Sequence, residues 1–236
     1  DIDKAIEILR VKGISKASKK MSRDAKEGVI AVSGDETKTS VIEVNCETDF
    51  VAKNDDFIIL ANNILQVAIT NNISSNEELN AITIDGMILA DKIIEQTGVI
   101  GEKIEVSGYE FIEAEQAIAY NHPGNRLASI VGLNKSGETI GEVGKQVAMQ
   151  IAAMDPIAID EAGVAPELIK KEMALGREIA EQEGKPEAML DKIAEGKVRK
   201  YLKENTLLNQ ATVRDNKKTV SQYLNETENG LTVTDF

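Results

Sequence analysis

The chain has 236 residues, with 27 Lys and Arg against 40 Asp and Glu and a formal net charge of −13 at pH 7. Because nonspecific nucleic-acid binding depends on a basic surface that neutralises phosphates, this acidic balance excludes a general polyanion binder, and we expect no direct nucleic-acid partner. Four Tyr, four Phe and no Trp leave few rings for a base-stacking or sugar-stacking platform and predict an aliphatic core.

Cysteine content and hydropathy indicate the compartment. The single cysteine, Cys46, cannot form an internal disulfide, which favours a reducing, cytoplasmic environment. The apolar runs are interrupted well before the length of a membrane-spanning helix, so we expect no membrane partner. The first residue is Asp1 and no basic-then-apolar signal segment follows it, so we expect the start to be the cut edge of a longer protein.

Residues 1–23 predict a short helix followed by a linker. The helix carries one apolar stripe at helical spacing, formed by Ile2, Ala5, Ile6 and Leu9. It is too short to be stable alone in water and needs a partner surface. Residues 16–23 are rich in Ser and Lys without periodicity, which predicts a solvated tether.

The next segment changes to a strand pattern. Two β-branched runs, residues 29–32 and 41–44, are separated by the turn-prone residues 33–35 and predict a hairpin. Farther along, Asn54 has a side chain suited to a helix N-cap, and it precedes apolar residues at helical spacing. We therefore expect a helix to follow the hairpin.

A second helix and a third strand complete this segment. Residues 88–97 predict a helix that ends at Gly98, because glycine is favoured where helices terminate. Residues 104–112 then predict a third strand. Residues 24–112 as a whole predict the order strand, strand, helix, helix, strand.

The same order returns later in the chain, so we predict a duplicated unit. Residues 117–120 repeat the first strand, and residues 129–134 repeat the second. A helix around Ile151 corresponds to the first helix of the earlier copy. Residues 219–224 and 231–236 correspond to its second helix and third strand, so the second copy is split by an insertion.

The insertion predicts a helical hairpin. Residues 166–205 are helix-forming on both sides of Gly184 and Pro186, with Gly184 suited to a helix C-terminus and Pro186 to the first turn of the next helix. The apolar positions are sparse, as in a thin antiparallel coiled coil, with Leu168, Leu175 and Ile179 facing Met189, Ile193 and Leu202. Such an arm buries little surface, so we expect it to contact a partner.

The predicted fold class is α+β. We expect two related subdomains, each with a small antiparallel sheet packed by helices, and an inserted antiparallel helical hairpin that forms a coiled coil. Residues 24–112 form the first core subdomain, and residues 113–164 and 206–236 form the second. Residues 165–205 form the hairpin.

Sequence patterns give no nucleotide, cofactor or metal site. Residues 139–146 approach a phosphate-binding loop but lack both its first Gly and its final Ser or Thr. One His and one Cys cannot assemble a thiolate and imidazole metal site. Cys46 and His122 are the residue types of a nucleophilic dyad, although a cysteine at a strand end is usually a small packed hydrophobe.

The segment VNCETDFVAKNDDF, residues 44–57, has two interpretations. In one, Thr48 or Asp49 caps a helix and Phe50 packs against that same helix. In the other, Phe50 lies beside an acid on a loop tip and fills a partner's pocket. Aromatic side chains serve as such anchors because they bury a large area with few rotatable bonds.

This segment resembles the signature stretch of the elongation factor Ts family, the guanine-nucleotide exchange factors of elongation factor Tu. The resemblance covers nearly the whole chain, in the motifs RDAKEG (23–28), HPG with Arg126 (122–126), VAMQIAA (147–153), GKP (184–186), EGK (195–197) and KTV (218–220). It implies two related subdomains with a projecting coiled coil. It also implies that residues 1–12 are the last helix of a small N-terminal helical domain.

The resemblance implies which residues meet the partner. Four residues match the loop that enters the GTPase domain of elongation factor Tu near its magnesium ion and helps to dislodge that ion: Thr48, Asp49, Phe50 and Val51. In the second subdomain, His122 and Met149 are implied to lie at a surface that contacts another domain of the partner.

The function implied is that of a translation elongation factor that is not an enzyme. It binds elongation factor Tu, promotes release of GDP by disturbing the magnesium and nucleotide site, and so allows GTP to reload. It needs no cofactor, no metal and no nucleotide of its own. Two alternatives are a factor-binding scaffold without exchange activity and a small-molecule enzyme that uses Cys46 and His122.

Overall fold

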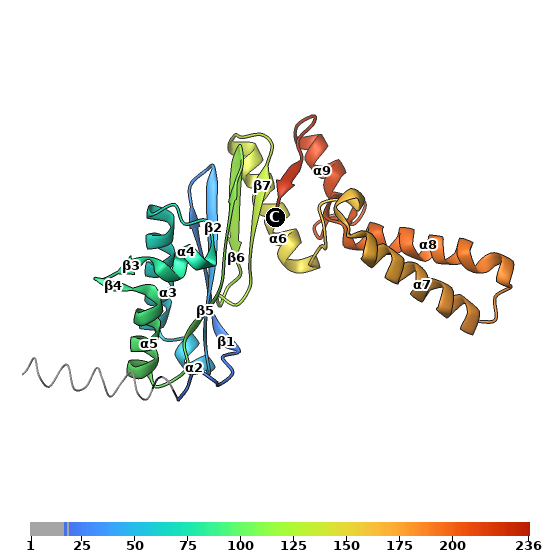
Figure 1. Cartoon of the computed structure of the whole chain (residues 1–236). Coiled ribbons are helices and arrows are strands. Elements are labelled where there is room, and N and C mark those ends of the chain that lie inside the picture. The colour runs from blue at the N-terminus through green and yellow to red at the C-terminus, as the bar shows by residue number, and fades with distance from the viewer. Residues whose placement is uncertain (1–16, 18) are drawn as a thin grey trace, which may run out of the picture. The chain divides into compact units, whose positions relative to one another are not determined.

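A computed structural model describes residue 17 and residues 19–236 (Figure 1). The helix expected over residues 1–10 lies outside the described residues. The chain divides into two compact units, Asp1–Ile130 and Val131–Phe236. The subdomain boundaries expected at residues 112, 164 and 205 divide the chain differently and stay predictions.

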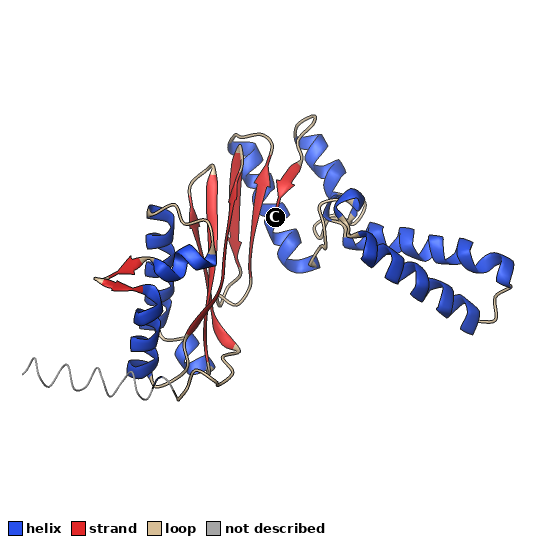
Figure 2. Ribbon diagram, in the orientation of Figure 1, coloured by secondary structure: helices blue, strands red, loops and turns tan. Residues whose placement is uncertain are grey.

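A three-stranded antiparallel sheet forms the centre of the first unit (Figure 2). Its order is β1 (Glu27–Gly34), β2 (Lys38–Cys46) and β5 (Glu105–Glu113). The hairpin of β1 and β2 confirms the prediction from the β-branched runs. In its turn, the Asp35 carboxylate accepts the backbone N–H groups of Thr37 at 2.8 Å and Lys38 at 2.9 Å.

One face of this sheet carries the core of the unit. Alternate residues of β2, namely Ile42, Val44 and Cys46, are fully buried, as expected where every second side chain of a strand points the same way. Helix α3 (Asp55–Thr70) packs against β1 and β2 on this face. The helix begins as predicted, because the Asn54 side chain accepts the Asp56 N–H at 2.8 Å.

Three further short elements and one helix follow α3: α4 (Asn76–Ala81), β3 (Thr83–Ile84), β4 (Met87–Ile88) and α5 (Leu89–Ile100). The predicted end of α5 at Gly98 is wrong. The helix continues to Ile100, which packs against the core, and it ends where Gly101 adopts a left-handed φ of 89°. Packing of the last turn outweighs the low helix propensity of Gly98.

The segment before β1 is not the solvated tether that its composition predicts. In its described part, Ala17 is fully buried. The Lys20 ammonium donates a hydrogen bond to the Gly101 carbonyl, and Arg23 lies 3.2 Å from the carboxylate of Glu47. These contacts dock the segment on the first unit, because its basic side chains find carbonyl and carboxylate partners there.

The strand order supports the predicted duplication. Strands β6 (Gln116–Asn121), β7 (Ala128–Leu133) and β8 (Val233–Asp235) form a second sheet with the order β6-β7-β8, which matches β1-β2-β5. The boundary between the units falls within β7. In the second unit, α6 (Glu138–Met154) follows β7, and α9 (Val220–Thr227) precedes β8.

The insertion is a helical hairpin, as predicted, formed by α7 (Pro166–Gln182) and α8 (Glu187–Asn205) (Figure 1). The predicted seam is partly wrong, because Leu175 and Met189 are exposed. The buried positions are Gly176, Ala180, Leu190, Ala194, Val198 and Leu202. Three of these positions are small because the two backbones lie close together there: a Cβ on Gly176 would lie 3.2 Å from the Cα of Ala194. Pro186 is the N-cap of α8 rather than part of its first turn.

Candidate partner-binding loop

A single turn of helix, α2 (Asp49–Ala52), lies between β2 and α3 and carries the loop that the sequence singles out. Thr48 is its N-cap, as the first interpretation predicts, and its hydroxyl accepts the Val51 N–H at 3.5 Å. Val51 packs against the core of the first unit, and Ala52 is buried within it. The end of α2 is therefore anchored by packing, whereas its beginning lies at the surface.

Phe50 points away from the core. Its side chain is 82% exposed, the largest exposed fraction among the large apolar side chains in the described part of the chain. Phe57, seven residues later, is 2% exposed. The interpretation that packs Phe50 against its own helix is therefore wrong. An exposed ring of this size costs free energy in water, which favours a surface made for contact.

Asp49 presents a negative charge beside this ring. Its carboxylate accepts a hydrogen bond from the Lys53 ammonium, one helical turn later, at 2.6 Å. The hydrogen bond and the positive charge of Lys53 lower the pKa of Asp49 below its ordinary value. The loop tip at neutral pH is thus an exposed aromatic ring next to an ionised carboxylate.

Glu102, which the sequence reading missed, holds the beginning of α2. Its Oε1 accepts the Thr48 hydroxyl at 2.6 Å. Its Oε2 accepts two backbone N–H groups, that of Thr48 at 2.9 Å and that of Glu47 at 3.0 Å. Glu102 lies between α5 and β5, 54 residues from Thr48. A pairing at this separation leaves no signal in local periodicity.

Glu47 makes a similar contact with the segment that carries Glu102. Its Oε1 accepts the Lys103 N–H at 2.7 Å, and Arg23 lies beside the same carboxylate. The Lys103 N–H and the Arg23 charge lower the pKa of Glu47 below its ordinary value. Two neighbouring segments are therefore joined by two carboxylates. Glu102 accepts backbone N–H groups of the segment that holds Glu47, and Glu47 accepts a backbone N–H group of the segment that holds Glu102.

Cys46 does not have the surroundings of a nucleophile. It is fully buried, and its thiol donates to the Thr48 carbonyl at 3.2 Å. Burial, and then the negative charge of Glu102, raise the pKa of Cys46 to about 11. The thiolate is the reactive form of cysteine, so at neutral pH this residue acts as a small packed hydrophobe.

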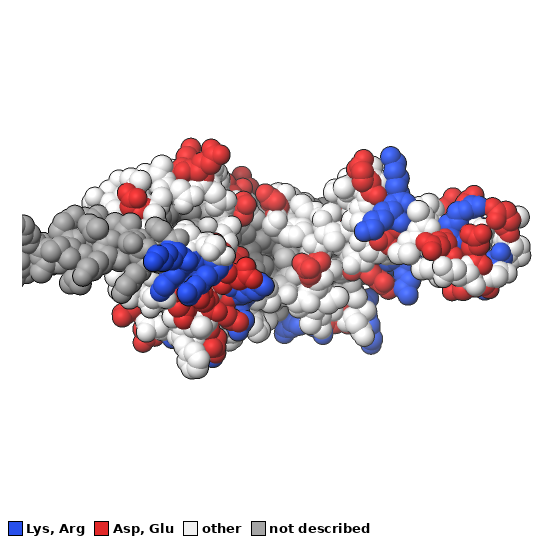
Figure 3. Space-filling model, turned by 60° about the horizontal axis from the view of Figure 1, so that its bottom comes forward, with Lys and Arg blue, Asp and Glu red and all other residues white. Residues whose placement is uncertain are grey.

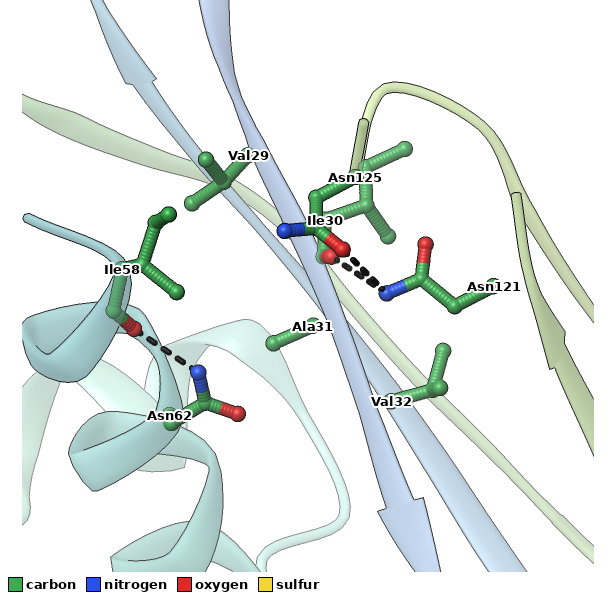
Figure 4. A pocket seen from close by; sticks show the side chains of 8 residues that line it. All are labelled: Val29, Ile30, Ala31, Val32, Ile58, Asn62, Asn121 and Asn125. Atoms are coloured by element: carbon green, nitrogen blue, oxygen red, sulfur yellow. Dashed lines mark hydrogen bonds between the residues drawn. The ribbon is translucent and has the colours of Figure 1, made fainter. Parts of the chain in front are cut away.

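His122 lies at the start of an exposed turn that is fixed on β1. Its Nδ1 lies 2.7 Å from the hydroxyl of Tyr120. The turn is held by Asn121, whose Nδ2 donates to the Ile30 carbonyl at 3.2 Å, and by Asn125, whose carbonyl accepts the Ile30 N–H at 2.7 Å. Figure 4 shows the two asparagines around a small hollow beside β1. The His122 ring is thus presented at the surface by a turn with defined geometry.

Met149 lies on α6 of the second unit and is half-exposed. The next residue, Gln150, is buried and holds a separate segment against the helix. Its side chain accepts the Val213 N–H at 2.8 Å and donates to the Ala211 carbonyl at 3.1 Å. His122 and Met149, expected at one surface, belong to different compact units, and their grouping stays a prediction.

Several charged side chains near α2 form ion pairs within the first unit. Figure 3 shows Lys and Arg atoms directly beside Asp and Glu atoms. The ion pairs of this unit include Lys53–Asp49 at 2.6 Å, Lys103–Glu105 at 2.6 Å, Arg126–Glu27 at 2.8 Å and Arg23–Glu47 at 3.2 Å. The exposed Phe50 ring lies on the same short helix as the Asp49 carboxylate of the first of these pairs.

Among residue 17 and residues 19–236, His, Cys, Asp and Glu side chains form no group of three or more that could hold a metal ion. Within the same residues, no helix has the length and apolar character needed to cross a membrane.

Comparison with known proteins assigns the chain to a family. A family model described as elongation factor TS matches residues 47–236, a range that includes α2 and everything after it. The chain belongs to the elongation factor Ts family. It is therefore a translation elongation factor with the α+β fold predicted from its sequence.

Individual members of the family match over the full chain. Elongation factor Ts of Christiangramia forsetii is 47% identical over 238 residues, which covers 100% of this chain and 86% of that protein. The protein of the same name from Amoebophilus asiaticus is also 47% identical with the same coverage. That of Porphyromonas gingivalis is 43% identical, again over 100% of this chain and 86% of the relative.

Proposed function

We propose that this chain binds elongation factor Tu and promotes release of its GDP, so that GTP can reload. The observation that carries the proposal is the 82% exposed Phe50 beside the ionised Asp49, on a loop within the matched family region. Thr48 and Val51 complete the contact loop in this proposal. Its chemistry is binding alone, without a covalent step.

The energetic requirement is moderate. A thousandfold faster release of GDP needs about 4 kcal/mol of barrier lowering. Burial of the Phe50 ring in a partner pocket contributes about 1.5–3 kcal/mol. Asp49, brought near the carboxylates around the partner's magnesium ion, would disturb that site by like-charge repulsion. The wider interface supplies the remainder.

Thermodynamic linkage connects binding to release. A protein that binds nucleotide-free elongation factor Tu more tightly than the GDP complex must weaken GDP binding by the same factor. The proposal therefore predicts a lower affinity of this chain for the GDP complex than for the empty partner. GDP must lower the affinity for this chain by the same factor by which this chain lowers the affinity for GDP.

The proposal includes a second contact surface at His122 and Met149. The exposure of both side chains supports it. We place the activity in the cytoplasm, where translation occurs, with elongation factor Tu as the partner. In this proposal the chain itself binds no nucleotide, nucleic acid or membrane.

The test is Phe50→Ala in an assay of fluorescent GDP release from elongation factor Tu, with catalytic amounts of the chain. We expect release to slow by about ten- to a hundredfold with little change in Tm, because the ring is exposed in the free protein. Val99→Ala is the matched control. Val99 is a 74% exposed apolar residue on α5 of the same unit, and its loss should leave release unchanged.

Two results would contradict the proposal. A parent chain that binds elongation factor Tu without accelerating release would be a scaffold, not an exchange factor. A Phe50→Ala variant that loses many degrees of Tm, with undiminished exchange per folded molecule, would make Phe50 a structural residue.

A further inference from the structure

The beginning of α2 is held from outside the loop. The helix has only four residues, and so short a helix cannot maintain itself in water. Val51 and Ala52 anchor its later part in the core. Glu47 and Thr48, on the other side of Phe50, are half-buried, and Glu102 accepts three of their polar hydrogens at 2.6–3.0 Å.

The contacts of Glu102 are specific in number and geometry. One carboxylate oxygen accepts the Thr48 hydroxyl, and the other accepts the consecutive N–H groups of Glu47 and Thr48. Hydrogen bonds to an ionised carboxylate are stronger than neutral ones. The Thr48 hydroxyl, oriented in this way, still accepts the Val51 N–H as the cap of α2. Glu102 therefore fixes both the backbone entering α2 and the side chain that caps it.

We propose that Glu102 is a positioning residue for nucleotide exchange: it holds the start of α2 so that Phe50 and Asp49 are presented to the partner in one orientation. This inference rests on the proposed function. A loop ordered in advance loses less conformational freedom on binding, and a displacement of about 1 Å in an active group can cost about a hundredfold in rate.

The contact between Glu102 and the loop is reciprocal. Glu47, which donates its N–H to Glu102, accepts the N–H of Lys103, the residue after Glu102. The two segments thus hold each other, and loss of either carboxylate leaves backbone donors of the other segment without their acceptor. We expect loss of Glu102 to loosen the loop rather than unfold the sheet, because β2 and β5 remain paired from Lys38 to Asn45.

Loop order is measured first, without any partner. The chain has no Trp, so Phe50→Trp introduces a single indole at the tip of α2. Time-resolved fluorescence anisotropy then reports the local motion of this indole on the nanosecond scale. We expect clearly larger local motion when Glu102→Ala is added, and no change when Glu113→Ala is added. Glu113 is the matched control because it is an exposed glutamate on β5, ion-paired with Lys38 at 2.7 Å.

Exchange kinetics are measured next, with Phe50 intact. We expect Glu102→Ala to lower kcat for GDP release by about tenfold with a smaller change in KM, because the loop acts as the nucleotide leaves. Glu102→Gln should restore most of the rate and the loop order, because its amide oxygen still accepts both N–H groups. Glu113→Ala should match the parent chain.

The outcomes separate this inference from the proposed function. A parent chain that does not accelerate GDP release overturns the proposed function, whereas the anisotropy result still decides whether Glu102 orders the loop. Normal kcat and normal anisotropy in Glu102→Ala overturn the inference and leave the function intact. If Glu102→Ala fails to fold, Glu102→Gln carries the test. Slow exchange in Glu102→Gln with an ordered loop would show a role for charge rather than position, and would also overturn the inference.

Discussion

At the scale of single residues, neighbours of the loop determine which side chains are available for contact or chemistry. Thr48, Asp49 and Phe50 are consecutive, yet the first is held by Glu102, the second by Lys53, and the third is exposed. Cys46, two residues before Thr48 at the end of β2, is fully buried. Residue type alone does not separate these roles, because each depends on burial and on hydrogen-bond partners.

Cys46 gives a prediction about reactivity. With its pKa raised to about 11, about one thiol in a thousand is ionised at pH 8. Only the thiolate is alkylated, so iodoacetamide should modify native Cys46 at least about a hundredfold more slowly than a free cysteine. The rate should rise with pH towards 11 and on unfolding in denaturant. Mass spectrometry of timed samples measures it.

Fast alkylation of the native chain at pH 8 would contradict this prediction and would return Cys46 to consideration as a nucleophile. The control is Cys46→Ala, which should not react. We also expect this variant to keep its exchange activity, because the Cys46 side chain is fully buried and cannot contact a partner directly.

At the scale of secondary-structure elements, the close approach of α7 and α8 determines which residues can line the seam of the helical hairpin, the arm of the second unit. Within the seam, Gly176 lies against Ala194. At the base of the arm, Val198 and Leu202 pack with Ala158 and Val164 of the second unit. The base of the arm is thus held to that unit by a hydrophobic cluster, and the distal part is the candidate contact surface.

Two glycines of the arm form a matched pair for testing this seam. Gly176→Val should destabilise the second unit by about 1–3 kcal/mol, because its Cβ would lie 3.2 Å from the Ala194 backbone and force the helices apart. Gly196→Ala, on α8 with nothing within 4 Å of its Cβ, should stabilise it by about 0.5–1 kcal/mol. Chemical denaturation followed by circular dichroism measures both. Equal stability of Gly176→Val and the parent would mean that the helices are farther apart.

At the scale of the whole molecule, the boundary between units lies within a strand instead of at a linker. Residues after 112 belong to the first unit because β6 binds its backbone. Ala117 N–H donates to the Glu36 carbonyl at 2.8 Å, and Ile30 N–H donates to the Asn125 carbonyl at 2.7 Å. The turn that carries His122 is therefore part of the first compact unit.

A pair of fragments tests this boundary. The fragment 1–130 should unfold cooperatively and at a higher Tm than the fragment 1–112, because the shorter one loses β6 and leaves backbone groups of β1 without partners. Thermal melts followed by circular dichroism provide the comparison. Equal Tm values would favour the subdomain boundary at residue 112 that the sequence predicts.

Features that depend on local pattern were predictable from the amino-acid sequence alone. Runs of β-branched residues located β1 and β2, Asn54 marked the start of α3, and the repeated order of elements predicted two sheets of matching topology. The motif around Phe50 was enough to indicate the family. These features are readable because strand alternation, helix spacing and caps involve residues a few positions apart.

Contacts between residues far apart in the sequence are visible only in the folded structure. Glu102 reaches Thr48 across 54 residues, α5 extends past Gly98 because Ile100 packs on the core, and Gly176 fits against Ala194. None of these contacts has a period or a local motif. They arise because packed backbones lie close together and because buried or half-buried polar groups need hydrogen-bond partners. Both depend on how the chain is folded. The loop at Thr48–Val51 was recognisable from its local motif. The contact of Glu102 with this loop was not, because it depends on the fold.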